Sequence, residues 1–293
     1  MVNYSGMRKK LICSQLAFLL MIFLPFELCL TYSCNQKPDK ETPAQADSIF
    51  SSPSNGKEVY IDLRKVLSGN PRKNATDVTI QYDPFFKTAK KYRGYDLNPL
   101  IDSVIKSEHF DTAQAVIIFE CIDGYKPVMD LSKIYDNAKG YIAIKDLDSS
   151  VKRNWPDSVE KIFTPYYLVW DDVKKEDNSF VWPFGLTGLR LMSKDQEYKD
   201  IYPYNDSSLV KGFMLFRQNC MKCHSLNKTG GTMAPEFNFP KNITEYWKEE
   251  DIIAFAKNPS SYRYNSRMSP VTNVSDADFT EIIRYIKSMK DRH

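Results

Sequence analysis

Apolar and polar positions follow different periods in different parts of the chain. Near the start, Leu16–Phe26 is an unbroken apolar run of 11 residues that follows the basic stretch Met7–Lys10. A helix that spans a bilayer needs about 20 apolar residues, so this segment predicts a cleaved export signal rather than a permanent span. The run ends before Ser33-Cys34, where the chain becomes polar.

The end of this leader resembles a bacterial lipobox, in which a Cys after a small residue is acylated and becomes the mature N-terminus. The resemblance implies lipidation of Cys34, and acyl chains contribute about 0.8 kcal/mol of membrane binding per CH₂. The alternative is simple secretion with Cys34 incidental. We expect residues 1–34 to be a signal peptide with this lipobox. Residues 35–55, with three prolines and four serines, are expected to form a flexible linker.

Between about residues 57 and 200 the pattern predicts strands alternating with short helices. Asn98 is expected to cap a helix that has Pro99 at its first position and an apolar face of Leu100, Ile101, Val104 and Ile105. Strands are predicted where apolar positions alternate or run together, at 59–63, 78–82, 115–121, 141–144, 166–170 and 186–192. Residues 56–203 are therefore predicted to form a mostly-β domain of α+β type.

Composition narrows the class of protein. A length of 293 residues suggests two domains, and 42% apolar residues are enough for packed cores. The net charge of +3, without a basic stripe, argues against a nucleic-acid partner. Six cysteines are too sparse for a disulfide scaffold, so each is interpreted from its neighbours.

The most specific chemistry lies at Cys220-Met221-Lys222-Cys223-His224, which has the order and spacing of a covalent haem attachment sequence. Two thiols separated by two residues can each form a thioether with a haem vinyl group, and the adjacent His224 then becomes the proximal iron ligand. A zinc site or a thioredoxin-like Cys pair is the competing interpretation. No second Cys or His pair completes a zinc site, because His109 and His293 are the only other histidines.

The segment around this motif resembles the class I cytochrome c domain, which implies an all-α domain at residues 204–293 with one covalent haem c. Leu209, Phe213 and Phe216 form the apolar face of a helix that enters the motif, and Phe279, Ile282, Ile283, Ile286 and Met289 form the matching face of a C-terminal helix. Gly212 and Tyr285 are the expected crossing point. Further matches are Gly230-Gly231, Met233-Ala234-Pro235, Ile252–Pro259 and Arg267-Met268-Ser269-Pro270. The resemblance implies that the carbonyl of Pro235 accepts the imidazole N–H of His224 and orients its ring.

The sixth iron ligand is a choice among sulfur atoms. Met268 lies 44 residues after His224 (268 − 224 = 44), in a loop beside a proline, and is the predicted distal ligand. Met233 follows His224 too closely, Met289 belongs to a helix face, and Met214 and Met221 adjoin the motif. Trp247, Arg263 and Arg267 are candidates for contacts with the haem propionates, or else ordinary residues of the rim.

The middle domain resembles the sulfite-oxidase-type molybdopterin domain, on Tyr92–Leu97, Phe119–Tyr125, Pro165–Leu168 and Trp182–Phe184. That family holds molybdenum through a Cys before its Tyr-x-Gly-x-x-Leu stretch, and residues 70–91 contain none. The resemblance thus implies the fold but argues against molybdopterin. Cys121, in a predicted strand, is interpreted as a structural thiol.

The sequence therefore predicts an exported monohaem cytochrome, tethered to the periplasmic face of a bacterial membrane, that transfers electrons through a His/Met-ligated haem. The expected partners are redox proteins such as a membrane oxidase or reductase, and an electron carrier is favoured over a self-sufficient enzyme. One alternative is a sulfite-dehydrogenase-like oxidoreductase, which would contain molybdenum. Another is a haem-based sensor or assembly protein, which would need a displaceable sixth ligand.

Overall fold

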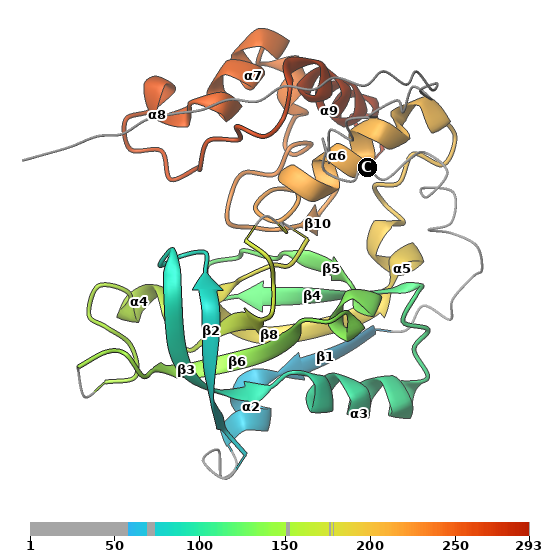
Figure 1. Ribbon diagram of the computed structural model, residues 1–293. Coiled ribbons are helices and arrows are strands. Elements are labelled where there is room, and N and C mark those ends of the chain that lie inside the picture. The colour runs from blue at the N-terminus through green and yellow to red at the C-terminus, as the bar shows by residue number, and fades with distance from the viewer. Residues whose placement is uncertain (1–57, 69–73, 151–152, 176, 178, 293) are drawn as a thin grey trace, which may run out of the picture. The chain divides into compact units, whose positions relative to one another are not determined.

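A computed structural model gives the fold (Figure 1). It describes residues 58–68, 74–150, 153–175, 177 and 179–292. All of these belong to one compact unit that spans Glu41–His293. The predicted signal peptide, Cys34 and the linker lie outside the described residues. None of the described helices is long and apolar enough to cross a membrane.

The middle region is built on one antiparallel sheet of eight strands. Seven of them follow the order β2-β3-β6-β7-β8-β4-β5, and β1 pairs with β8 outside this path. The long strand β8 therefore pairs with β7, β4 and β1. The strands are β1 (Glu58–Asp62), β2 (Thr76–Asp83), β3 (Thr88–Asp96), β4 (Ala115–Cys121), β5 (Val128–Asp130), β6 (Lys139–Asp146), β7 (Tyr166–Asp171) and β8 (Phe184–Ser193).

Strand β4 is buried on both faces, which explains why its sequence is a nearly continuous apolar run. Successive side chains of a strand point to opposite faces. Ile117 and Phe119 accordingly pack into the core of the sheet region, with Leu189 and Leu191 of β8. Val116 and Ile118 point the other way and join a cluster formed mainly by the C-terminal helices.

Short helices connect the strands: α2 (Leu63–Ser68), α3 (Asn98–Glu108), η2 (Leu131–Tyr135), α4 (Glu160–Phe163) and α5 (Lys194–Tyr198). Two expectations were wrong in detail. Leu63 does not continue the first strand but starts α2, because the Asp62 carboxylate accepts the backbone N–H of Arg64 and Lys65 and starts a helical turn. Asn98 is not the cap of α3; Leu97 holds that position, and Asp96 accepts the Asn98 N–H.

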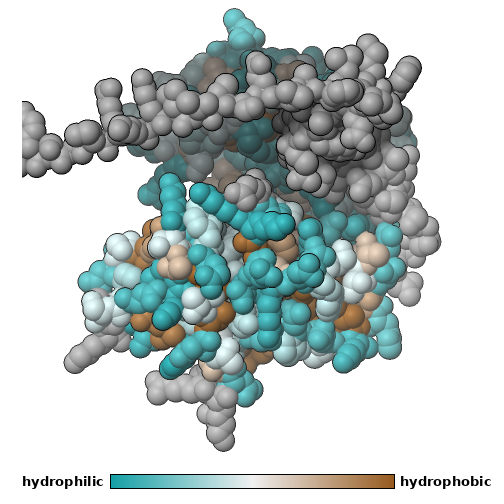
Figure 2. Space-filling view, in the orientation of Figure 1, coloured by the Kyte–Doolittle hydropathy of each residue, from teal (hydrophilic) through white to brown (hydrophobic). Residues whose placement is uncertain are grey.

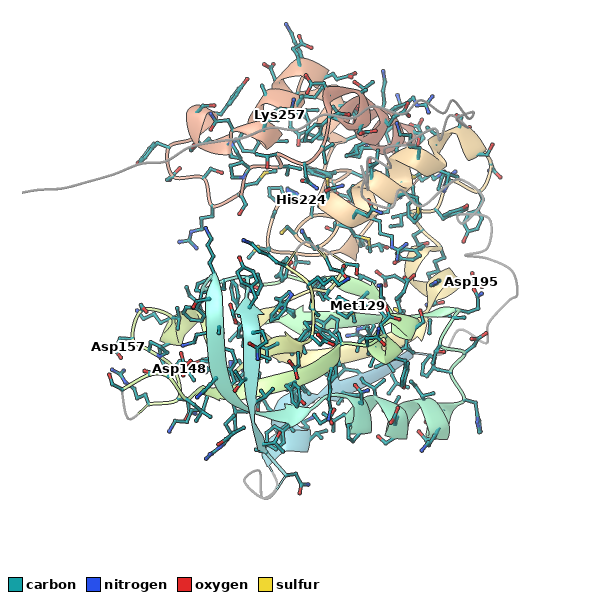
Figure 3. All side chains as sticks on the ribbon, in the orientation of Figure 1. Met129, Asp148, Asp157, Asp195, His224 and Lys257 are labelled. Atoms are coloured by element: carbon teal, nitrogen blue, oxygen red, sulfur yellow. The ribbon has the colours of Figure 1, made fainter. Side chains whose placement is uncertain are left out.

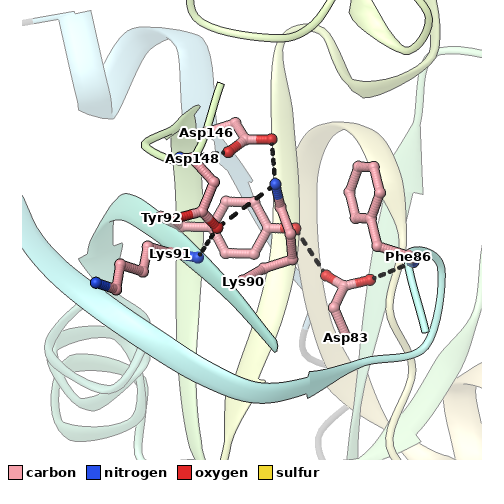
Figure 4. A network of polar contacts seen from close by, with 7 residues as sticks. All are labelled: Asp83, Phe86, Lys90, Lys91, Tyr92, Asp146 and Asp148. Atoms are coloured by element: carbon pink, nitrogen blue, oxygen red, sulfur yellow. Dashed lines mark hydrogen bonds and ion pairs between the residues drawn. The ribbon is translucent and has the colours of Figure 1, made fainter. Parts of the chain in front are cut away.

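Strand β3 was not predicted, because its charged residues hide the alternation. Figure 4 shows how they are accommodated: the Lys90 ammonium lies 2.7 Å from the carboxylate of Asp146, a residue that is 1% exposed. The Tyr92 hydroxyl donates to buried Asp83 at 2.8 Å. Burial, followed by the charge of Asp83, raises the pKa of Tyr92 far above its usual range. A buried ion pair is costly to break, so these contacts favour one register of the β2-β3-β6 strands.

The C-terminal region is helical, with α6 (Val210–Asn219), α7 (Glu249–Lys257), α8 (Pro259–Tyr262) and α9 (Asp276–Ser288). Between them lie η3 (Ser207–Leu209), β9 (Ser225–Leu226), β10 (Thr229–Gly230) and η4 (Ile243–Glu245). The predicted crossing of α6 and α9 is confirmed: a Cβ added at Gly212 would lie 2.6 Å from the Cβ of Tyr285. Ser275 begins α9 by accepting the N–H of Asp278.

The face of the sheet region that Figure 2 shows carries mostly hydrophilic side chains, with hydrophobic residues between them. Scattered exposed hydrophobic residues are normal for a folded protein and mark no site by themselves.

Candidate haem site

The haem attachment motif forms a tight coil directly after α6. Cys220 follows the last residue of the helix and donates its N–H to the carbonyl of Phe216 at 2.8 Å. The carbonyl of Cys220 then accepts the N–H groups of both Cys223 (3.1 Å) and His224 (3.0 Å). Both cysteines and the histidine are therefore held within one short turn at the end of a buried helix.

The His224 side chain is oriented by a backbone carbonyl (labelled in Figure 3). Its Nδ1 lies 2.6 Å from the carbonyl oxygen of Pro235. Because a carbonyl can only accept, Nδ1 carries the hydrogen and Nε2 keeps its lone pair. Burial lowers the pKa of His224, although the Pro235 hydrogen bond acts in the opposite direction. A neutral imidazole with a free Nε2 is the form that ligates iron.

Two glycines let the following loop lie against the motif. Gly230 has φ +116°, and a Cβ there would lie 2.5 Å from the carbonyl oxygen of His224. At Gly231 an added Cβ would be 2.3 Å from the carbonyl oxygen of Lys222. The N–H groups of Gly231 and Ala234 donate to the carbonyls of Met221 and Cys223, at 2.8 and 3.0 Å. Larger residues would therefore displace the loop that carries Pro235.

The thiols of Cys220 and Cys223 are free and half-buried. Burial raises the pKa of Cys220 to about 12 and also raises the pKa of Cys223, so both are protonated near neutral pH. Addition of each S–H across a haem vinyl group would form a C–S bond and would need no oxidant. Haem c requires two thiols for its attachment and an imidazole nitrogen as an iron ligand, and this segment offers both beside apolar side chains.

The structure places Met268 in the apolar cluster against which Cys220 and Phe237 also pack. It is half-buried, between the exposed Arg267 and Ser269. Three of the other candidate methionines, Met214, Met221 and Met289, are buried in the core, and Met233 is 48% exposed.

The candidate propionate contacts fall into two places. Trp247 and Arg263 both lie against Phe255, with the Trp247 and Phe255 ring centroids 5.3 Å apart and the guanidinium 5.9 Å from the Phe255 ring. Arg267 is exposed and forms no ion pair with another described residue. A cavity of about 380 Å³ lies beside Trp247, and Cys220, Cys223, His224 and Met268 do not line it.

A loop of the sheet region contacts the motif directly, which the sequence analysis did not anticipate. Lys126 donates its N–H to the carbonyl of Lys222 at 2.9 Å, and Thr232 donates its N–H to the carbonyl of Gly124 at 2.8 Å. Tyr125 lies between Gly124 and Lys126, the two residues that form these bonds. Burial raises the pKa of Tyr125, and the nearby Cys223 and Cys121 raise it further. The Asp123-Gly124 pair is a turn signal in the sequence, but it carries no information about the partner of this loop.

Cys121 lies at the end of β4 and is 8% exposed. Its side chain belongs to the core of the sheet region, and burial raises the pKa of its thiol far above the usual range. Among the described residues, no group of three or more His, Cys, Asp or Glu side chains is arranged to hold a metal ion.

Comparison with known proteins agrees with this geometry for one part of the chain. No solved structure matches the chain. The family model described as cytochrome c matches residues 209–290, the segment that contains the attachment motif, the Pro235 loop and Met268. The C-terminal third of the chain is a cytochrome c domain, and it follows a mostly-β region.

Proposed function

We propose that this chain is a monohaem c-type cytochrome that carries electrons between redox proteins at the outer face of a bacterial membrane. The observation that carries the proposal is the bond between His224 Nδ1 and the Pro235 carbonyl beside two free thiols. When bound, the haem would supply one-electron chemistry at its iron. The chain's own residues would attach it through Cys220 and Cys223 and ligate it through His224.

Met268 is proposed as the distal ligand. Its support is its half-buried position in the cluster that includes Cys220, together with the core packing of Met214, Met221 and Met289. A thioether opposite an imidazole raises the reduction potential relative to harder ligand pairs, and leaves no open position for a substrate. These properties suit an electron carrier. Trp247, Arg263 and Arg267 are proposed as contacts for the propionates.

Export and a lipid anchor at Cys34 belong to the same proposal. They are supported by the leader sequence, because the basic stretch, the short apolar run and Ser33-Cys34 occur in the order of a lipoprotein signal. Extracytoplasmic maturation would also supply the compartment in which the haem is attached.

The middle region is proposed to be a sulfite-oxidase-like scaffold without molybdenum that docks a redox partner. Burial of Cys121 in the sheet core supports this, since a metal-binding thiolate needs an accessible site. Metal analysis of the purified protein tests it: we expect iron without molybdenum. Molybdenum that is lost in Cys121→Ser would instead establish the dehydrogenase alternative.

The test of the cytochrome proposal is expression of the full chain in a bacterium that attaches haem c. We expect a red protein whose haem stays with the polypeptide after extraction with acidified acetone, one haem per chain, and a reduced spectrum unchanged by carbon monoxide. Extractable haem would overturn covalent attachment. Carbon monoxide binding would favour the sensor alternative.

A further inference from the structure

A cavity with charged walls lies between the sheet and the haem attachment loop. It is a cavity of about 220 Å³, here named the junction cavity. Its charged lining residues come from β1, β4, the β4–β5 loop, β8, α5 and the β9–β10 turn; they are Glu58, Glu120, Lys126, Arg190, Glu197 and Lys228. The proposed electron-transfer function assigns no role to it.

Arg190 pairs with two of these carboxylates. Arg190 forms ion pairs with Glu120, at 2.7 Å, and with Glu58. The side chain of Glu197, in contrast, forms no hydrogen bond or ion pair with another residue in the described part of the chain. Lys126 has no ion pair there either, and the Lys228 ammonium lies over the ring of Phe239, 5.5 Å from its centroid.

Glu197 is consequently a carboxyl group with an unusual proton affinity. Burial raises its pKa to about 7, against the opposing effects of Lys126, Arg190 and Arg217. Arg217 is paired with Asp130 at 2.6 Å. Five charged residues line the same cavity as Glu197, and Arg217 of α6 also acts on its charge; the five are Glu58 of β1, Glu120 of β4, Lys126, Arg190 of β8 and Lys228. Asp130 of β5 pairs with both Arg217 and Lys194, and Lys194, Asp195 and Tyr198 belong to the same helix as Glu197.

Two walls of the junction cavity rest on the haem attachment motif. Gly230 lines the cavity and lies against the backbone of His224. A Cβ added at Gly230 would be 2.5 Å from the His224 carbonyl oxygen. Lys126 also lines it and donates its N–H to the Lys222 carbonyl. Two residues that line the cavity therefore contact the backbone of the segment that would hold the haem.

We propose that Glu197 takes up a proton when the cytochrome c domain is reduced and releases it on oxidation. This inference rests on the proposed haem function. A one-electron donor protein would supply the electron to the bound haem, and the Glu197 carboxylate would take up a fraction of one proton from water per electron. Reduction would remove one unit of positive charge from the group that His224 would hold, and a less positive neighbour strengthens proton binding at Glu197. Glu197 is a half-buried residue, so solvent can deliver the proton.

The experiment is a redox titration of the haem-loaded full chain between pH 5 and pH 9 at constant ionic strength. We expect the midpoint potential to fall as the pH rises through neutrality. Proton binding stabilises the reduced form, and this stabilisation is lost when the pH is high. We expect reduction to raise proton affinity about three- to tenfold, the scale of one unit charge in a protein interior. A tenfold difference corresponds to about 59 mV over the whole range.

Glu197→Gln should abolish this pH dependence, while the exposed Glu250→Gln on α7 should leave it intact. Redox-induced infrared difference spectra of the wild type should show a protonated carboxylic acid band in the reduced form that Glu197→Gln lacks. A flat potential in the wild type, or an unchanged slope in Glu197→Gln, would overturn the proposal and assign any proton to another group, such as a propionate. Absence of covalent haem would overturn the proposed function itself, which the absorption spectrum detects before any titration.

Discussion

Gly212 of α6 and Tyr285 of α9 touch at the crossing of the two helices that enclose the haem attachment motif. A Cβ at Gly212 would lie 2.3 Å from the carbonyl oxygen of Glu281 and 2.6 Å from the Cβ of Tyr285. The Tyr285 hydroxyl is bound in turn to the carbonyl of Ile201. The crossing can therefore neither widen nor slide without loss of buried contacts.

Gly212→Val is expected to destabilise the haem-loaded protein by about 1–3 kcal/mol, because the added methyl groups must push α6 and α9 apart. Chemical denaturation followed by helical circular dichroism measures this. Gln218→Ala, on the exposed side of α6, is the control and should leave the denaturation midpoint unchanged. Equal stability of both variants would show that the crossing is not tightly packed.

Met268→Ala should remove the distal ligand and keep the covalent haem. We expect a lower midpoint potential, since a weaker or solvent ligand replaces the thioether, and carbon monoxide binding to the reduced protein. Met233→Ala, an exposed methionine in the Pro235 loop, is the matched control. If the Met233 variant binds carbon monoxide and the Met268 variant does not, the assignment is reversed.

Cys220→Ser and Cys223→Ser should each retain haem through the remaining thioether, whereas the double variant should lose it to acidified acetone. Haem-stained denaturing gels measure the bound fraction. Cys121→Ser should retain all of its haem, because that thiol lies in the sheet core. It should instead lower stability by about 1–3 kcal/mol, the cost of a poorly satisfied buried hydroxyl. Haem loss in Cys121→Ser would contradict the assignment of the attachment residues.

Gly124→Val should weaken the contact between the sheet and the attachment loop. Gly124 has φ +86°, and a Cβ there would lie 2.5 Å from the Thr232 Oγ1 and 2.9 Å from the Met233 nitrogen. We expect faster amide hydrogen exchange at Thr232 and Lys126, whose N–H groups bond across this contact. The neighbouring exposed Ile122→Ala should leave both amides protected.

Two ion pairs of β3 make a matched test of burial. Lys90→Met leaves the buried Asp146 carboxylate unpaired, and should cost about 3 kcal/mol of stability. Arg93→Met breaks the exposed pair with Asp77, which solvent already screens, and should not shift the denaturation midpoint measurably. A similar loss in both variants would show that burial does not distinguish them.

The sequence predicts the cytochrome region well, because its chemistry depends on local order and spacing. The Cys220–His224 motif, the faces of α6 and α9, and the Gly212–Tyr285 crossing all follow from residues close along the chain or from helical periodicity. Strand β3 was missed since Lys90, Lys91 and Arg93 interrupt its apolar pattern, and their partners lie more than 50 residues away or on the paired strand.

Contacts between the sheet region and the C-terminal region could not be predicted. Nothing near Glu197 distinguishes it from an ordinary helical glutamate; its raised pKa is a result of packing against the sheet and α6. The Asp123-Gly124 pair is typical of a turn, but nothing in the sequence identifies Thr232 as its partner. Likewise, the apolar run of β4 indicated burial on both faces without indicating what covers the second face.

The second face of β4 ties the sheet region to the C-terminal helices, so the two regions cannot be separated without exposing apolar side chains. Val116, Ile118 and Met192 complete the same apolar cluster as Phe213, Phe279 and Ile282. A fragment that begins at residue 204 would leave this side of the cluster exposed to water. A fragment that ends at residue 203 would expose the apolar side chains of Val116, Ile118 and Met192 on the sheet. Each region therefore buries apolar surface of the other, and haem loading of the C-terminal fragment alone should be inefficient.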